Sequence, residues 1–304
     1  MEQSDRALSS IAPASERAVR PLLGLLLGIF AVSTASIFIR FAQRDGAPAL
    51  IIAAYRLGFA ALLLAPVALA GYRRELAQLT GREWRLALLS GLFLGGHFAT
   101  WILSLAYTSV ASSVVLVNAS PLLVALASPL FLREALTWRT LSGVLVATAG
   151  GVIIGWGDFG LGGQQALGDL LALAGAVAAA GYFLIGRRLR ARLSLITYIF
   201  IVYSTAALAV IALSLLMRQP FGGYPPRTFL WFLLLALVPQ LIGHSSFNWA
   251  LRYTSATLAT VPVLGEPIGS TLLAYIILGE GLTWWKLVGG GLILIGIAIV
   301  FWRK

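Results

Sequence analysis

Cysteine is absent from the 304 residues, which excludes disulfides, thiolate metal ligands and thiol nucleophiles. Charge is scarce as well, since only 11% of the residues are Asp, Glu, Lys or Arg whereas 59% are hydrophobic. A water-soluble globule of this composition could not hide its apolar surface from solvent. We therefore expect lipid to surround most of the chain.

Barrel-length strands are also missing, and the apolar runs have the length of helices. Lipid admits only helices or closed barrels, because every backbone amide must be paired inside the protein, and a spanning helix needs about 20 mostly apolar residues. The sequence predicts an all-α membrane protein with ten transmembrane helices, at residues 22–42, 48–70, 85–106, 110–132, 138–156, 167–187, 195–217, 228–251, 256–278 and 284–302.

The residues before the first run, 1–20, form a polar tail. The run itself is too long for the core of a signal peptide and has no plausible cleavage site, so it should remain as the first membrane helix.

The net charge of +11 does not indicate a nucleic-acid partner, because the basic residues lie in short loops rather than on one face. With the amino terminus inside, the cytoplasmic loops collect most of them, and the other side keeps only Arg44, Arg218, Arg227 and Lys286. This asymmetry predicts a multi-pass protein of the cell inner membrane with both termini cytoplasmic.

An internal repeat organises the chain. The segment that begins at Tyr107 recurs 146 residues later at Tyr253, and the matches include Pro121 with Pro267, Glu134 with Glu280 and Trp156 with Trp302. The two prolines should bend the fourth and ninth helices. Five spans in each copy would place the second copy upside down relative to the first. We therefore predict a cytoplasmic tail (1–20) and two inverted five-helix repeats (21–157 and 158–304), which is the architecture of secondary transporters.

At these residues the sequence resembles the drug/metabolite transporter (DMT) superfamily, in particular its ten-helix EamA-type exporters. The matching pieces are residues 250–297, their weaker copy at 104–152, and Arg56 early in the second span. The overall pattern is similar to that of the YddG-type aromatic amino acid exporters. One departure is Arg133, which stands before Glu134 where many family members carry glycine, and it puts the helix cap there in doubt.

Polar residues deep inside the spans are the candidates for a substrate site. Glu266 must be protonated, paired or facing water, in either a structural role beside Pro267 or a proton or substrate role. Arg56 either attracts a substrate carboxylate or is tied to backbone carbonyls. On the third helix His97 and Trp101 lie four residues apart and share one face, and so do His244 and Asn248 on the eighth helix. Each pair either packs against neighbouring helices or binds the substrate. We expect a site at the repeat interface formed by Ser33, Arg56, His97, Trp101, Asn118, Tyr182, His244, Asn248 and Glu266.

The predicted function is alternating-access export of small metabolites, with amino acids, aromatic ones included, as the expected substrates. No cofactor, metal or catalytic residue is expected, and the partners would be the substrate, membrane lipids and at most a second copy in a homodimer. One alternative is a multidrug or nucleotide-sugar carrier of the same fold.

A remote alternative is an intramembrane enzyme, because residues 155–158 match the GxGD string of intramembrane aspartyl proteases. Asp158 falls in a predicted outer loop, however, and we expect no second aspartate inside a helix to complete the dyad. A nucleotide-binding Walker loop is absent too, so an ATP-driven pump is not expected.

Overall fold

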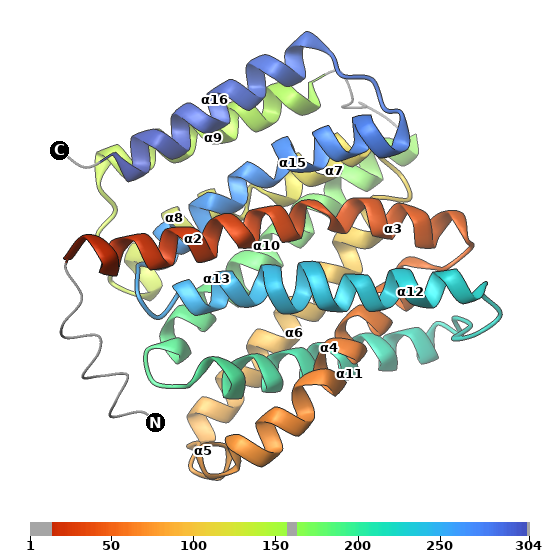
Figure 1. Ribbon diagram of the computed structural model, residues 1–304, viewed down its shortest axis with the longest axis vertical. Helices are drawn as coiled ribbons and strands as arrows, with labels where there is room; N and C mark the ends of the chain where they lie inside the picture. The colour runs from red at the N-terminus through yellow and green to blue at the C-terminus, as the bar shows by residue number, and fades with distance from the viewer. Residues whose placement is uncertain (1–13, 157–162, 303–304) are drawn as a thin grey trace.

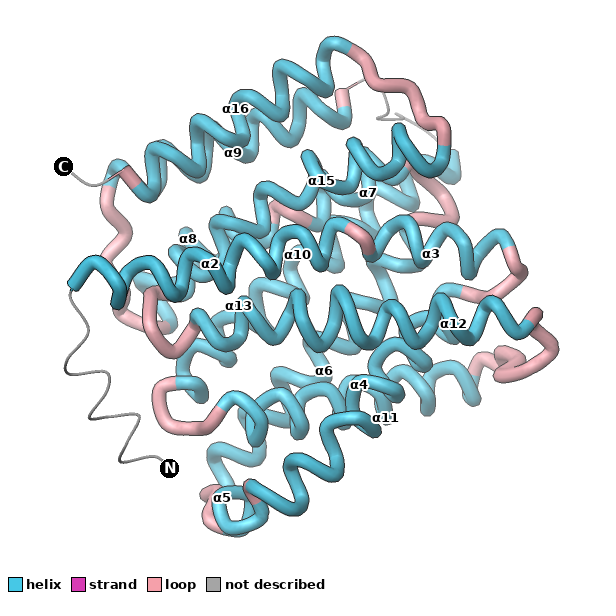
Figure 2. Tube along the Cα trace, in the orientation of Figure 1, coloured by secondary structure: helices cyan, strands magenta, loops and turns pink. Residues whose placement is uncertain are grey.

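The structure, a computed structural model, describes residues 14–156 and 163–302. Within these residues ten helices are long and apolar enough to cross a membrane, and no strand occurs (Figures 1 and 2). This confirms the all-α membrane fold. In chain order the elements are α2 (Ala14–Ser33), α3 (Ala35–Arg44), α4 (Ala49–Gly71), α5 (Arg73–Ala77), α6 (Gly81–Ser104), α7 (Val110–Val117), α8 (Ser120–Phe131), α9 (Trp138–Gly155), α10 (Gly163–Arg190), α11 (Leu195–Leu216), α12 (Pro226–Leu235), η1 (Ala236–His244), α13 (Ser245–Ala250), α14 (Ala256–Thr260), η2 (Val261–Gly265), α15 (Glu266–Leu273), η3 (Ala274–Leu278) and α16 (Trp284–Phe301).

The helix bounds differ from the expected ones by a few residues. The third span begins at Gly81 rather than 85, because Thr80 and Glu83 form a capping box that starts α6 earlier than the apolar run does. The sixth runs from Gly163 to Arg190, longer than 167–187 at both ends. Residues 14–20 of the expected tail belong to α2. Residues 1–13 and the expected repeat boundary at 157/158 lie outside the described residues.

Several spans are interrupted near their middle. The fourth breaks between Val117 and Ser120, and the ninth passes through a 3-10 turn before Glu266. Pro121 and Pro267 each stand in the first turn after the break, where a missing N–H is tolerated. The expected bends therefore lie directly before these prolines. Such breaks bring polar backbone and side chains to the middle of the membrane, which is tolerated where they line a cavity.

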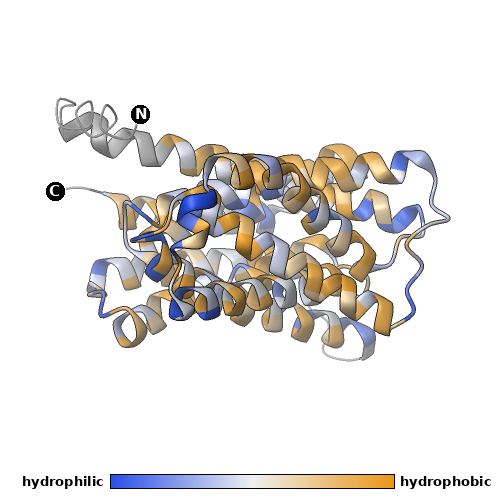
Figure 3. Cartoon of the chain, turned by 90° about the horizontal axis from the view of Figure 1, so that it is seen from below, coloured by the Kyte–Doolittle hydropathy of each residue, from blue (hydrophilic) through white to orange (hydrophobic). Residues whose placement is uncertain are grey.

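Large apolar side chains cover the outside of the helices, for example Phe30, Leu62 and Leu208, each more than 60% exposed. Hydrophilic residues gather mainly toward the ends of the helices (Figure 3). The molecule thus has a lipid-facing girdle and two polar ends. We call the end formed by connections 72–80, 132–137, 191–194 and 251–255 the basic end, and the end formed by connections 45–48, 105–109, 217–225 and 279–283 the far end.

Helices α9 and α16 pack side by side at one edge of the molecule (Figure 1). A Cβ added to Gly150 would lie 2.5 Å from the carbonyl oxygen of Gly289, and one added to Gly296 would lie 2.5 Å from that of Gly143. Gly143 and Gly150 recur as Gly289 and Gly296 at the 146-residue offset, so each contact is the counterpart of the other. Glycine is required here because the two backbones touch.

Candidate functional site

A small cavity lies at the centre of the bundle, where the broken spans meet. Its volume of about 30 Å³ has room for about two water-sized molecules. It is lined by Val32, Ala35, Arg56, His97, Trp101, Val117, Asn118, Ser120, Ala179, Phe183, His244, Phe247, Val263 and Glu266. The lining comes from spans one, two, three, four, six, eight and nine, which draw on both halves of the chain.

Most of the expected site residues meet at this cavity, namely Arg56, His97, Trp101, Asn118, His244 and Glu266. Ser33 does not line it: its hydroxyl donates to the carbonyl of Ile29 at 2.8 Å and lies against Gly269. Tyr182 and Asn248 do not line it either, since the Asn248 amide donates to the Tyr182 hydroxyl in a neighbouring polar cluster.

Arg56 is the most unusual member of the site. Its side chain is fully buried, and its Nε donates to the Oε1 of Gln240 at 2.8 Å. The guanidinium carbon lies 3.9 Å from the centre of the Phe98 ring, a cation–π contact. Neither Nη1 nor Nη2 has a hydrogen-bond partner among the described residues. The expected tie to backbone carbonyls is therefore not formed, and two strong donors remain free beside the cavity.

Glu266 begins α15, directly after the 3-10 turn, and is only 6% exposed. Its Oε2 accepts a hydrogen bond from the Asn118 side chain at 3.3 Å, and Asn118 also donates to the carbonyl of Val114 at 2.8 Å. The N-terminal position in a helix favours a carboxylate. Glu266 is thus both held by a structural hydrogen bond and placed on the wall of the cavity.

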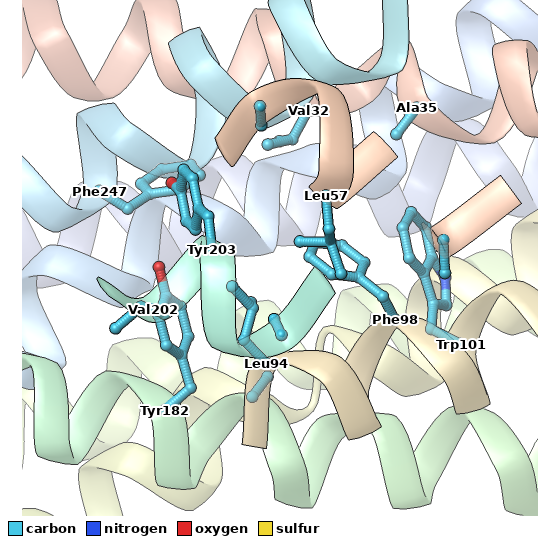
Figure 4. Close-up of a cluster of buried hydrophobic side chains, with 14 of the residues drawn as sticks. Val32, Ala35, Leu57, Leu94, Phe98, Trp101, Tyr182, Val202, Tyr203 and Phe247 are labelled. Atoms are coloured by element: carbon cyan, nitrogen blue, oxygen red, sulfur yellow. The ribbon is translucent and has the colours of Figure 1, made fainter. Parts of the chain in front are cut away.

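Aromatic rings form another part of the wall. The rings of His97 and Trp101 are stacked, with centres 5.9 Å apart, and the two histidines, His97 and His244, approach to 6.1 Å. Because Nδ1 of His97 lies 3.0 Å from the Gly175 carbonyl, that nitrogen carries a proton. Figure 4 shows Phe98 and Trp101 projecting from α6, with Phe98 beside Leu57. Nε1 of Trp101 and Nδ1 of His244 find no partner in the part of the chain that the structure describes.

The neighbouring polar cluster joins three helices behind the cavity wall. Asn248 also lies 3.5 Å from the Tyr203 hydroxyl, which in turn contacts the Ser245 hydroxyl at 3.2 Å. In Figure 4 the side chain of Tyr182 extends toward Tyr203. Asn248 further donates to the carbonyl of His244 at 2.9 Å, so the cluster supports a cavity residue from outside.

Sequence reasoning missed two side chains that shape the site. Gln240, which holds Arg56, lies in the π-helical segment η1 beside Pro239. An uncharged amide in the middle of a span is the same signal that identified Asn118 and Asn248, so Gln240 could have been found. Phe98 carries no such signal, because an aromatic residue in an apolar helix is ordinary.

The expectation that no second aspartate lies inside a helix is wrong. Asp169 belongs to α10, where its Oδ1 accepts from the hydroxyls of Thr108 and Ser112 at 3.0 and 2.8 Å. These bonds give it a structural task, and Asp158 lies outside the described residues. Within the described residues no group of three or more His, Cys, Asp or Glu side chains could hold a metal ion.

A bundle of ten apolar helices with a polar cavity at its centre defines the class as a multi-pass membrane transporter. The chain belongs to the EamA-like transporter family, which matches it twice, over residues 19–156 and 166–302. The double match agrees with the repeat seen in the sequence.

Similar proteins share the transporter description. An uncharacterized transporter of Archaeoglobus fulgidus is 26% identical over 84% of this chain and 98% of its own length. One of Clostridium kluyveri is 25% identical over 79% of each chain, and the uncharacterized transporter YyaM of Bacillus subtilis is 22% identical over 81% of this chain and 82% of its own. A crystal structure with 23% identity shares the fold, with a TM-score of 0.75 over 93% of this chain and 96% of that one.

Proposed function

We propose that this protein is a secondary transporter that exports small metabolites, with amino acids, aromatic ones included, as its substrates, by alternating access around the central cavity. The observation that supports this best is Arg56, whose two free Nη donors stand beside a cavity that also contains the carboxylate of Glu266.

The two ionic groups match the two ends of an amino acid. A guanidinium presents parallel N–H donors that fit a carboxylate in a bidentate pair, and such bonds are about twice as strong as neutral ones. No carboxylate of the described residues forms an ion pair with Arg56. A substrate carboxylate would supply the missing partner, and the Glu266 carboxylate would accept the substrate ammonium.

The rest of the wall suits an apolar or aromatic side chain. Trp101, Phe183 and Phe247 line the same cavity as the ionic groups. Stacking on such rings contributes about 0.5–1.5 kcal/mol beyond the burial of area. The free Nε1 of Trp101 adds a neutral donor at the edge of this surface.

Transport requires the cavity to expand and to open in turn to either side. A volume of about 30 Å³ is far below the roughly 300 Å³ of the smallest ligand pockets. The broken spans supply joints at which the halves can move, as in other carriers with inverted repeats. We place the basic end in the cytoplasm of a cell with an inner membrane, because basic loops remain on the inside.

The multidrug and nucleotide-sugar alternatives fit the cavity less well. A cationic drug would meet the guanidinium of Arg56, which forms no ion-pair contact among the described residues. A nucleotide sugar carries phosphate groups, and Arg56 is the one cationic side chain among the cavity's lining residues.

Counterflow into proteoliposomes tests the proposal with three matched compounds and a cationic dye. Phenylalanine has both ionic groups, phenylalaninamide lacks the carboxylate, and 3-phenylpropionate lacks the ammonium. We expect transport of phenylalanine above both analogues and none of the dye. Transport of the dye, or of phenylalaninamide as well as phenylalanine, would contradict an amino acid substrate.

Variants separate the two ionic roles. Arg56→Gln and Arg56→Lys should both reduce phenylalanine transport, because neither side chain offers the paired N–H donors of a guanidinium. The loss should be smaller for Arg56→Lys, because lysine keeps the positive charge. Glu266→Gln removes the charged acceptor for the substrate ammonium, so it should reduce phenylalanine transport, and it should abolish any response to a pH gradient if Glu266 carries a proton. Arg139→Gln is the matched control, because Arg139 binds the Ile299 carbonyl away from the cavity.

A further inference from the structure

The basic end is closed by a set of bonds centred on Glu134. Its Oε1 accepts from Nε of Arg187 at 2.6 Å, and its Oε2 accepts from the backbone N–H of Ala256 at 2.8 Å. Arg187 in turn donates from Nη1 to the carbonyl of Leu251 at 2.8 Å. One carboxylate thus joins the ends of spans four, six, eight and nine.

The far end contains the same parts from the other halves of the repeat. At the 146-residue offset Leu251 corresponds to Leu105, and Arg40 donates from Nη1 to the Leu105 carbonyl at 2.5 Å. Its Nη2 donates to the carbonyl of Thr108 at 2.9 Å. Arg40 therefore has at the far end a place like that of Arg187 at the basic end, although it lies one residue out of the 146-residue register, where its counterpart is Gly186.

The turn that presents the carboxylate is repeated too. Glu134 donates its backbone N–H to the Ser128 carbonyl at 3.4 Å, and Glu280 donates its own to the Ala274 carbonyl at 3.2 Å. Ser128 and Ala274 are again 146 residues apart. Glu280 consequently has the same backbone hydrogen bond as Glu134, and it lines the same pocket as Arg40.

The bonds of the glutamate carboxylate differ between the two ends. In the described residues the carboxylate of Glu280 makes no ion pair with Arg40 and no hydrogen bond to Val110, which corresponds to Ala256. Glu280 and Arg40 instead line an open vestibule of about 620 Å³ together with Gln43 and Leu278. The bonds of the glutamate carboxylate are therefore formed at the basic end and absent at the far end, where the vestibule lies.

We propose that Glu280 is the latch of the far end, closing it in the opposite conformation by binding the Arg40 guanidinium and the backbone N–H of Val110. In the same step Glu134 releases Arg187 and Ala256, and the basic end opens. Each state then contains one formed latch and one broken latch of the same chemistry. The two states therefore differ little in free energy, as a carrier that alternates between them requires.

This inference rests on the proposed alternating-access function, but its test needs no substrate. A cysteine at Leu103, which lines the vestibule, is the reporter in a chain without other cysteines. The rate at which a membrane-impermeant maleimide modifies the purified protein in lipid nanodiscs measures how often the far end is open.

Two chemically identical substitutions should act in opposite directions. Glu134→Gln weakens the basic-end latch and should slow labelling about tenfold, the size expected for loss of a charge-assisted hydrogen bond. Glu280→Gln weakens the far-end latch and should leave labelling as fast as in the parent or faster. Glu75→Gln is the matched control, because Glu75 is a carboxylate of the basic end that caps α11 through Ser194 and Thr197 and has no part in the repeat. It should not change the rate.

A second pair of variants removes the backbone donors instead of the carboxylates. Ala256 and Val110 are the first residues of α14 and α7, where proline is tolerated and only its missing N–H matters. Ala256→Pro should slow labelling and Val110→Pro should not. Shifts in the same direction for both members of either pair, or slower labelling in Glu280→Gln, would overturn the latch. Opposite shifts in a protein that carries no amino acid would instead contradict the proposed function and leave the latch in place.

Discussion

Arg133 and Gly279 share one left-handed backbone conformation, with φ of 57° and 72°, although they lie 146 residues apart. Each stands directly before one of the two repeat-related glutamates, Glu134 or Glu280. The departure from glycine at Arg133 therefore does not remove the helix cap. The cap forms with an arginine in a conformation that costs an L-residue about 1–2 kcal/mol.

Replacing Arg133 by glycine should therefore stabilise the protein. The relief of strain exceeds the extra freedom that glycine gives the unfolded chain, for a net gain of about 0.5–1 kcal/mol. Thermal unfolding in detergent should show a higher melting temperature for Arg133→Gly and a lower one for Gly279→Ala. A lower melting temperature for Arg133→Gly would mean that the arginine side chain contributes more than its backbone costs.

The orientation in the membrane can be read from single cysteines in exposed loops. Ala191→Cys lies at the basic end and Gly222→Cys at the far end, and both side chains would face solvent. An impermeant maleimide added to intact cells should modify only the second, since the basic end is expected inside. Labelling of both from the outside would contradict the ten-span topology.

Trp101 should set the preference for large substrates. Trp101→Ala removes an aromatic wall of the cavity, so transport of phenylalanine or tryptophan should fall several-fold more than that of alanine. Trp101→Phe keeps a ring and serves as the control for folding. An equal loss for every amino acid would assign Trp101 to packing alone.

The contact between α9 and α16 should tolerate no added methyl group. Gly289→Ala would press its Cβ against the backbone of Gly150, at a cost of about 1–3 kcal/mol. The matched control is Gly291→Ala on the same helix, whose Cβ would meet no atom within 4 Å. The melting temperature should fall in the first variant only. An equal change of melting temperature in both variants would show that helix propensity, rather than packing between α9 and α16, determines the effect of the substitution.

The far-end ion pair of Asp45 predicts a dependence on pH. Hydrogen bonds from Arg227, at 2.6 and 2.9 Å, lower the pKa of the Asp45 carboxyl below its ordinary value, and Thr228 adds a further bond. A lowered pKa in the folded state means that these bonds stabilise the protein above the unfolded pKa of about 3.9 and are lost as the pH falls through the folded pKa.

Asp45→Asn should therefore melt below the parent protein at pH 7, and the gap should shrink as the pH falls below about 4 toward the lowered pKa of the folded state. Melting curves of both proteins in detergent, recorded at pH 7 and below about pH 4, measure the difference in melting temperature. A gap of the same size at both would show that the charge of Asp45 is not what stabilises this connection.

The broken fourth and ninth spans show how far a local pattern reaches. Pro121 and Pro267 predicted a bend in each, because a proline lacks an N–H wherever it stands. The π-helical turn around Tyr275 contains no proline, and Pro239 in the turn around Gln240 does not by itself predict a widened turn, since the extra residue in such a turn is fixed by what the helix packs against. Local chemistry thus predicted where two helices bend but not which turns widen.

The sequence by itself determined the spans, their number and the repeat. A run of about 20 apolar residues has no stable form in lipid other than a helix, so Leu195–Leu216 could be predicted as a helix without reference to any neighbour. The tertiary structure alone decided that Arg56 meets Gln240, 184 residues away, and that Glu134 holds Ala256 rather than Glu280 holding Val110. Such contacts depend on how distant helices pack laterally against one another, which the residue pattern within a single helix does not contain.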